Sequence, residues 1–331
     1  MPLIIRAPTP EEQERTRRFQ VHKNYVGGIA LFVSRNYGAE RTARLTALLQ
    51  AQRELSGFRR IRQRRVNNER LAQYLTLAWA SELQYRLAGL GDASLLQYSN
   101  AWAPVHAYYA VYMGAQAWFT TIGAEDIVDN HTGSLNTLSN QIRQRDLFPL
   151  PWNVTCSGCP HLDEHQFNGL PADADASAHV ELLSAPRLDD FWSRFGKLLE
   201  TTRRRRLDRN LEDWKRRRGR KNTKAEEKRQ LASRLLPTTV FDFFWRLRVR
   251  SNYRDVRTFL MAGVADDWQE EFYNALLCVT ESSLALLENL VVAYSGPDVY
   301  RSTIGEFIGS LRNDMPILRV PFEERAALIA P

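Results

Sequence analysis

Apolar residues recur every three or four positions along most of the chain, which is the spacing of an α-helix with one buried face. The clearest stripe lies between about 93 and 122 and comprises Trp102, Val105, Tyr108, Tyr109, Tyr112, Ala115 and Phe119. The same spacing predicts further helices over about 39–55, 58–88, 134–145, 240–250, 266–296 and 302–312, and one from about 188 into the run 203–229. No alternating pattern of strand length accompanies them, so the sequence predicts an all-α multi-helix bundle.

Local signals refine this picture at the two ends of the chain. Thr9 and Pro10, followed by two glutamates, are typical of a helix start, and Gly27-Gly28 predicts an interruption of that helix. Pro104 either kinks the aromatic helix or marks its start. Beyond about 312 we expect a proline-containing tail.

The segment from about 124 to 186 breaks the helical pattern. It is rich in proline and glycine and has little periodicity beyond the short helix near 134–145. We interpret it as an irregular excursion, packed on the helices or partly mobile. The chain then divides into an N-terminal helical half (1–123), the irregular acidic segment (124–186) and a C-terminal helical half (187–331).

Composition narrows the class of protein. The chain has 331 residues, of which 44% are hydrophobic and 11% aromatic, so it can build a substantial core in one large or two smaller domains. This excludes a disordered tail, a collagen-like fibre and a small disulfide scaffold. The sequence contains no run of 18 apolar residues, no signal peptide is evident, and there are three cysteines. We therefore expect a cytoplasmic protein without a membrane span.

The net charge of +7 is unevenly distributed. Residues 203–229 contain 14 Lys/Arg and 5 Asp/Glu, a net charge of +9, whereas residues 124–181 contain nine acids and two arginines, a net charge of −7. A smaller basic cluster, of five arginines, lies in 59–65. The high isoelectric point is thus a local property, and a polyanion is attracted to such a patch.

The basic run predicts a nucleic-acid interface, with RNA favoured over DNA. Guanidinium groups donate paired hydrogen bonds to phosphate, and each neutralised phosphate releases counterions. Two alternatives remain: a solvated helix, or pairing with the protein's own acidic segment or a partner protein. The candidate binding residues are Arg203, Arg204, Arg205, Arg206, Lys215, Arg216, Arg217, Arg218, Arg220, Lys221, Arg246, Arg248 and Arg254.

A second group of residues has the chemistry of zinc ligands. Cys156, Cys159, His161 and His165 lie within ten residues, a spacing too short for all four to surround one tetrahedral ion. A site that uses both cysteines, one histidine and a distant residue such as Cys278 remains possible, and the alternative is a polar turn. We expect no obligatory cofactor.

A third group surrounds the predicted end of the helix over 240–250. Five arginines between 246 and 257 alternate with Asn252, Tyr253 and Asp255. One interpretation is a helix cap with surface arginines. The other is a basic pocket for phosphate or ribose, with Arg250, Asn252, Tyr253 and Asp255 as candidate catalytic residues.

The aromatic stretch 107–118 resembles the third helix of HEPN domains, the helical bundles of prokaryotic toxins and defence ribonucleases. The stretch 250–255 is similar to that family's motif of an arginine, a polar residue and a histidine four to six positions after the arginine. Here Asp255 stands where the histidine belongs. Arg17 and His22 fit the spacing, but near the N-terminus of the chain. The resemblance implies RNA binding and metal-independent cleavage across a homodimer, or binding without cleavage.

These observations lead to two hypotheses from different classes. The first is a HEPN-like, RNA-binding protein of a toxin or phage-defence system, with metal-independent endoribonuclease activity if it is an enzyme. The second is a non-catalytic subunit whose basic and acidic segments dock a partner protein. No P-loop, Ser-His-Asp order, G-x-G-x-x-G or H-E-x-x-H motif points to another enzyme class.

Overall fold

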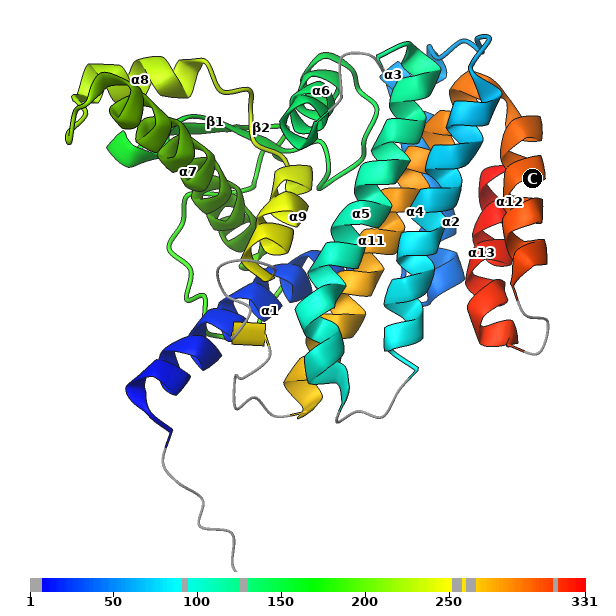
Figure 1. Ribbon diagram of the computed structural model, residues 1–331, viewed down its shortest axis with the longest axis horizontal. Helices are drawn as coiled ribbons and strands as arrows, with labels where there is room; N and C mark the ends of the chain where they lie inside the picture. The colour runs from blue at the N-terminus through cyan, green and yellow to red at the C-terminus, as the bar shows by residue number, and fades with distance from the viewer. Residues whose placement is uncertain (1–7, 91–94, 125–129, 252–257, 260–265, 312–314) are drawn as a thin grey trace, which may run out of the picture.

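The computed structural model describes residues 8–90, 95–124, 130–251, 258–259, 266–311 and 315–331. Nearly all regular structure within them is α-helical, which confirms the predicted all-α bundle. Figure 1 shows a body of long helices and, beside it, a smaller group that includes α7 (Phe191–Arg218), α8 (Ala225–Ser233) and the hairpin of β1 (Thr155–Cys159) and β2 (Glu164–Asn168).

Three long helices form the centre of the body: α4 (Asn68–Ala88), α5 (Leu96–Ile122) and α11 (Asp266–Ser295). Helices α5 and α11 approach closely at Gly114, where a Cβ atom would lie 2.6 Å from Leu284 Cδ1. Helix α11 is long and apolar enough to cross a membrane, but 78% of its most apolar window is buried inside the protein. It is therefore the core helix of the bundle.

Shorter helices and α1 (Pro10–Tyr37) cover this centre. The predicted start of α1 is confirmed, because Glu12 N–H donates to Thr9 Oγ1 at 3.2 Å. The predicted interruption at Gly27-Gly28 is wrong, since α1 continues through it. These glycines instead permit close packing: a Cβ at Gly28 would lie 3.2 Å from Arg194 Cδ on α7.

Two further boundaries differ from the prediction. The helix expected over 58–88 is divided into α3 (Ser56–Arg59) and α4, because the intervening chain bonds elsewhere: Arg64 N–H donates to the Tyr294 carbonyl at 2.8 Å. The expected tail contains α13 (Pro316–Ile329), which packs beside α2 (Arg41–Glu54) and α12 (Pro297–Ser310). Pro104 lies inside α5, so it does not mark the start of that helix.

A buried ionic network anchors α13 to the body. Arg325 is fully buried and donates to both carboxylate oxygens of Glu82 and to Glu288, at 2.7 to 3.0 Å. Arg86 also donates to Glu82. Burial is the largest single influence on the pKa of this carboxyl, and by itself it would raise that pKa. The neighbouring arginines nevertheless lower the pKa of Glu82 to about 2. Burial raises the pKa of Glu288, which Trp79 and Tyr300 also contact.

The smaller group contains α6 (His131–Gln144), β1 (Thr155–Cys159), β2 (Glu164–Asn168), α7 (Phe191–Arg218), α8 (Ala225–Ser233) and α9 (Val240–Val249). The strands form an antiparallel hairpin around the short 3-10 helix η3 (Pro160–Leu162), in a segment where no strand was predicted. Helix α7 ends at Gly219 with φ +61°, a left-handed conformation that glycine adopts readily.

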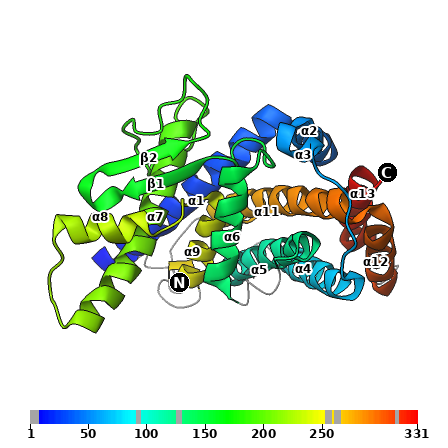
Figure 2. The ribbon, with the colours of Figure 1, turned by 90° about the horizontal axis from the view of Figure 1, so that it is seen from above.

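Helix α9 lies between α7 and α5, as Figures 1 and 2 show from two directions. Cys156 exchanges backbone hydrogen bonds with Thr238, just before α9, at 2.8 and 2.9 Å. Phe148, Trp152 and Val154 are fully buried in the main core, so this part of the acidic segment is packed on the helices. The hairpin and its flanking loops therefore fix α9 and α6 against α7.

Candidate nucleic-acid interface

The basic side chains of α7 divide into buried and exposed groups. Arg203 and Arg206 are 1% and 8% exposed, whereas Arg205, Arg209 and the residues from Arg216 to the end of the helix are exposed. The expectation that Arg203 and Arg206 lie open to solvent is therefore wrong. The reason is that α7 is covered on one face by the hairpin and on another by α9.

Arg203 holds the hairpin and the chain after α8 together. Its guanidinium donates to the carbonyl oxygens of Gly158 at 2.7 Å, Leu236 at 3.0 Å and Ala232 at 3.0 Å. Burial lowers the pKa of Arg203, and carbonyl dipoles replace water as its hydrogen-bond partners. This arginine is a structural cross-link.

Arg204 and Arg206 also have internal partners. Arg204 donates to the Pro160 carbonyl and to Glu200, both at 2.9 Å. Arg206 lies 2.9 Å from Asp242, whose pKa is raised by burial, and donates to Asn136. Three of the four consecutive arginines thus contribute to the fold, and Arg205 alone among them is exposed.

The outer end of α7 and the two basic residues after it are exposed, and together they hold five of the thirteen predicted binding residues. Arg216 lies 3.4 Å from Asp213, and Arg218 lies over the ring of Trp214 at 5.2 Å. Arg220 pairs with Glu227 at 3.1 Å. Arg217 and Lys221 make no ion pair with any residue that the structure describes. Their positive charge is available to a ligand.

Within the described ranges, the acidic segment neutralises little of the basic run. Among the described residues, Glu164 is its one carboxylate that pairs with the run 203–229, at 2.7 Å from Arg229. Asp146 accepts hydrogen bonds from Ser56, and Asp175 from backbone N–H groups of its own loop. Within the described residues, the expected pairing of the basic run with the acidic segment therefore occurs at the contact between Arg229 and Glu164.

A pocket of about 240 Å³ lies where α6, α7 and α9 meet the chain after α8. Arg206, Arg209 and Arg234 line it, and none of the lining residues that the structure describes is acidic. Arg209 and Arg234 are exposed and make no ion pair within the described chain. The other lining residues are Thr132, Leu135, Asn136, Asn210, Leu235, Leu236 and Trp245. We call this cavity the basic pocket.

Next to the basic pocket lies an aromatic cluster. Arg248, on the turn of α9 after Trp245, donates to the Tyr109 hydroxyl at 3.0 Å and lies 5.2 and 5.1 Å from the Tyr108 and Tyr109 ring centroids. His131 adjoins Thr132 of the pocket, and its Nδ1 lies 2.7 Å from the Tyr108 hydroxyl. Burial lowers the pKa of His131, and the charge of Arg248 lowers it further.

Tyr112 completes this cluster. Its ring centroid lies 4.8 Å from that of His131 and 5.5 Å from that of Tyr108, onto which it stacks. Tyr109, Tyr112 and His131 are half-buried, so each leaves part of its ring to solvent. We call Tyr109, Tyr112, His131 and Arg248 the aromatic ledge.

The three described arginines near the end of α9 do not converge. Arg246 is buried and donates to the hydroxyls of Thr201 and Thr202, so its predicted place on a surface is wrong. Burial, followed by the charge of Arg250, lowers the pKa of Arg246 to about 10. Arg248 belongs to the aromatic ledge. Asn252, Tyr253, Arg254 and Asp255 lie outside the described residues.

Arg250 contacts a histidine from a distant part of the chain. Its Nη1 lies 3.2 Å from Nε2 of His22 on α1. Burial holds the pKa of His22 well below its usual range, with further lowering by Arg250, Arg246 and Arg18. This imidazole is 1% exposed. Sequence spacing pointed to His22 only through Arg17, whereas the observed partner is Arg250.

The proposed zinc ligands diverge. Cys156 lies in the main core, and Cys159 packs with Leu207, Leu211 and Ala232 in a separate cluster. His161 Nε2 lies 2.7 Å from Asp208, and His165 contacts the ring of Phe167. The described residues form no group of three or more metal-ligating side chains, and Cys278 lies apart on α11. Burial raises the pKa of the Cys156 thiol to about 12.

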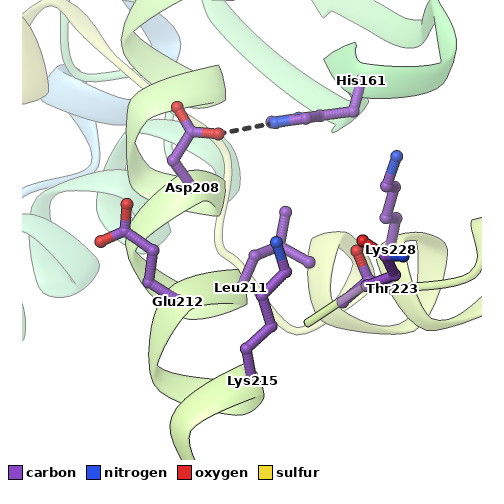
Figure 3. Close-up of a pocket in the computed structure, with 8 residues that line it drawn as sticks. His161, Asp208, Leu211, Glu212, Lys215, Thr223 and Lys228 are labelled. Atoms are coloured by element: carbon purple, nitrogen blue, oxygen red, sulfur yellow. Dashed lines mark hydrogen bonds and ion pairs between the residues drawn. The ribbon is translucent and has the colours of Figure 1, made fainter. Parts of the chain in front are cut away.

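A second pocket, of about 370 Å³, lies on another face of α7 (Figure 3). His161 reaches across to Asp208, while Lys215 and Lys228 border the cavity from α7 and α8. Glu212 also lines this pocket, which therefore mixes both charge signs. Lys215, predicted as a nucleic-acid contact, belongs to this mixed pocket.

No protein family model, curated protein or solved structure matches this chain. Sequence reasoning missed Arg209, Arg234 and Trp245, which come from three separate elements. Of these three, only Arg209 had a signal in the sequence: it lies one turn beyond Arg206, on the same face of α7.

Proposed function

We propose that this protein binds nucleic acid, RNA in particular, through the basic pocket and the exposed outer end of α7. The observation that carries the proposal is the lining of the pocket: three arginines surround it, no described lining residue is acidic, and Arg209 and Arg234 have no ionic partner within the described chain. An unneutralised guanidinium pair beside a cavity favours a ligand with phosphate groups.

The surface continues beyond the pocket. Arg217 lies about three turns after Arg206 on the same face of α7, because a helix repeats every 3.6 residues. Arg209 lies between them on that face. A polyanion that entered the pocket would meet further positive charge along α7, which suits a chain of phosphates better than a single small anion.

The direct test is binding of a fluorescein-labelled RNA of about 20 nucleotides, followed by fluorescence anisotropy at about 100 mM salt. The double variant Arg209→Gln/Arg234→Gln removes two exposed charges that support no internal contact in the described structure. We expect about tenfold weaker binding for each lost contact, since charged hydrogen bonds contribute roughly 1.5–3 kcal/mol.

A charge-matched control is available elsewhere on the surface. Arg62 and Arg65 are exposed on the chain between α3 and α4, away from α7. The double variant Arg62→Gln/Arg65→Gln loses the same charge and should bind RNA as the wild type does. Equal weakening in both variants would contradict a localised interface. Absence of RNA binding, with a protein recovered from a pull-down, would favour the docking-subunit hypothesis.

Cleavage of the bound RNA is the second candidate function, and the contact between Arg250 and His22 favours it. The Arg250 guanidinium can hold a phosphate, and the buried His22 imidazole accepts from it and positions it. In the setting of a toxin or phage-defence ribonuclease, RNA would be cut in the presence of EDTA, and Arg250→Ala would abolish cleavage. Intact RNA after incubation with the wild type would restrict the function to binding.

A further inference from the structure

The basic pocket and the aromatic ledge form one continuous surface. Trp245 lines the pocket and Arg248 follows it by one helical turn on α9. Thr132 lines the pocket and His131 precedes it at the start of α6. The surface therefore joins guanidinium groups to aromatic faces over two elements.

The size of the pocket restricts what enters it. Its volume of about 240 Å³ lies below the roughly 300–1,000 Å³ of sites for drug-sized ligands. One nucleobase is a ligand of suitable size, whereas a helix of paired bases is not. Leu135, Leu235 and Leu236 supply apolar walls, and the indole of Trp245 supplies a flat one.

The polar groups of the pocket also match a nucleotide. Asn136 and Asn210 present amides, which pair with the donor and acceptor edges of bases. The Asn136 oxygen already accepts from Arg206, whereas the Asn210 side chain makes no hydrogen bond within the described chain. Arg209 and Arg234 are placed to hold the flanking phosphates.

The ledge offers a second position for a base. The Tyr109 hydroxyl and the neighbouring rings fix the Arg248 guanidinium, and the Arg248 Nε–H is buried without an acceptor. Half-exposed rings of Tyr109 and Tyr112 provide faces for stacking. Sites for single-stranded nucleic acid typically combine aromatic rings and arginine planes with free cations. Unpaired bases can stack on these planes, whereas a base inside a duplex is already stacked on both faces by its neighbours.

We infer that this surface takes an unpaired stretch of RNA, with one base in the basic pocket beside Trp245 and a neighbouring base on the aromatic ledge. This inference rests on the proposed function and specifies its substrate class. It adds that base stacking, and not charge alone, contributes to binding.

The experiment compares a labelled single-stranded RNA of about 12 nucleotides with the blunt duplex of the same strand. The wild type should prefer the single strand. Trp245→Leu should weaken binding of the single strand by about 5- to 150-fold, the range for one stacked base. Trp245→Phe keeps an aromatic plane and should retain most of the affinity. The half-buried Trp268, at the start of α11, supplies the matched control Trp268→Leu.

The outcomes separate the inference from the proposed function. Equal affinity for duplex and single strand, with no effect of Trp245→Leu, would overturn the inference and leave charge-based binding in place. Failure to bind either RNA would overturn both. Circular dichroism of each variant shows whether α9 is intact, and equal losses in Trp245→Leu and Trp245→Phe would also count against stacking.

Discussion

The division of the basic helix into structural and exposed arginines leads to a quantitative prediction for Arg203→Met. Methionine keeps the apolar stem but removes every donor of the guanidinium. The carbonyl oxygens of Gly158, Leu236 and Ala232, which Arg203 contacts at 2.7 to 3.0 Å, would then lose this donor.

The cost follows from these contacts. A buried acceptor left without a donor costs about 1–3 kcal/mol, and entering water recovers part of that loss. Three acceptors therefore give a destabilisation of about 3–5 kcal/mol. This is a large fraction of the roughly 5–15 kcal/mol by which a domain is stable.

Arg205→Met is the matched control, since Arg205 is exposed on the neighbouring position of the same helix. Its free energy of unfolding should stay within about 0.5 kcal/mol of the wild type. Urea unfolding followed by tryptophan fluorescence measures both, and Arg203→Met should shift the midpoint by about 1 M or more at unchanged m value. Equal midpoints for the two variants would refute the assignment of Arg203 as a cross-link. The result also matters for function, because binding lost on replacing residues 203–206 together would reflect unfolding.

Two further predictions concern stability. Burial lowers the pKa of His22, His106 and His131, so the unfolded chain binds more protons just below the usual histidine pKa of about 6.5. The free energy of unfolding should therefore fall as the pH drops below about 6.5, by up to about 1.4 kcal/mol per pH unit and histidine, and His22→Gln should reduce this dependence; urea titrations at several pH values that gave a flat profile would contradict it. Arg325→Met leaves two buried carboxylates without their main partner and should cost about 3–5 kcal/mol, with partial recovery on adding Glu288→Gln. Thermal unfolding would show it, and an unchanged midpoint would count against the buried network.

Much of the fold could be predicted from the sequence because helix periodicity is a local property. The stripe from Trp102 to Phe119 marked α5 correctly, and Thr9 with Pro10 marked the start of α1. The interruption predicted at Gly27-Gly28 was wrong, because a glycine that permits close helix packing cannot be distinguished from the local sequence from a glycine that ends a helix. The β1–β2 hairpin was not predicted, because Thr155–Cys159 is short and is also held by backbone hydrogen bonds to Thr238, far along the chain.

The site was harder to predict for a related reason. Charge density indicated α7, but it did not distinguish Arg203, which faces carbonyl oxygens, from Arg209, which faces the pocket. That distinction depends on which neighbouring element covers each face of the helix. Arg234 and Trp245 come from other elements, and His22 meets Arg250 across 228 positions, so no spacing rule could connect them.

The salt dependence of RNA binding tests the central claim most directly. Each phosphate neutralised on a single strand contributes about 0.7 to the slope of log affinity against log salt concentration. If Arg209 and Arg234 each contact a phosphate, their double variant to glutamine should reduce the magnitude of that slope by about 1.4 between roughly 50 and 200 mM salt. The Arg62→Gln/Arg65→Gln control should retain the wild-type slope. Identical slopes for the wild type and both double variants would contradict an RNA interface at the basic pocket.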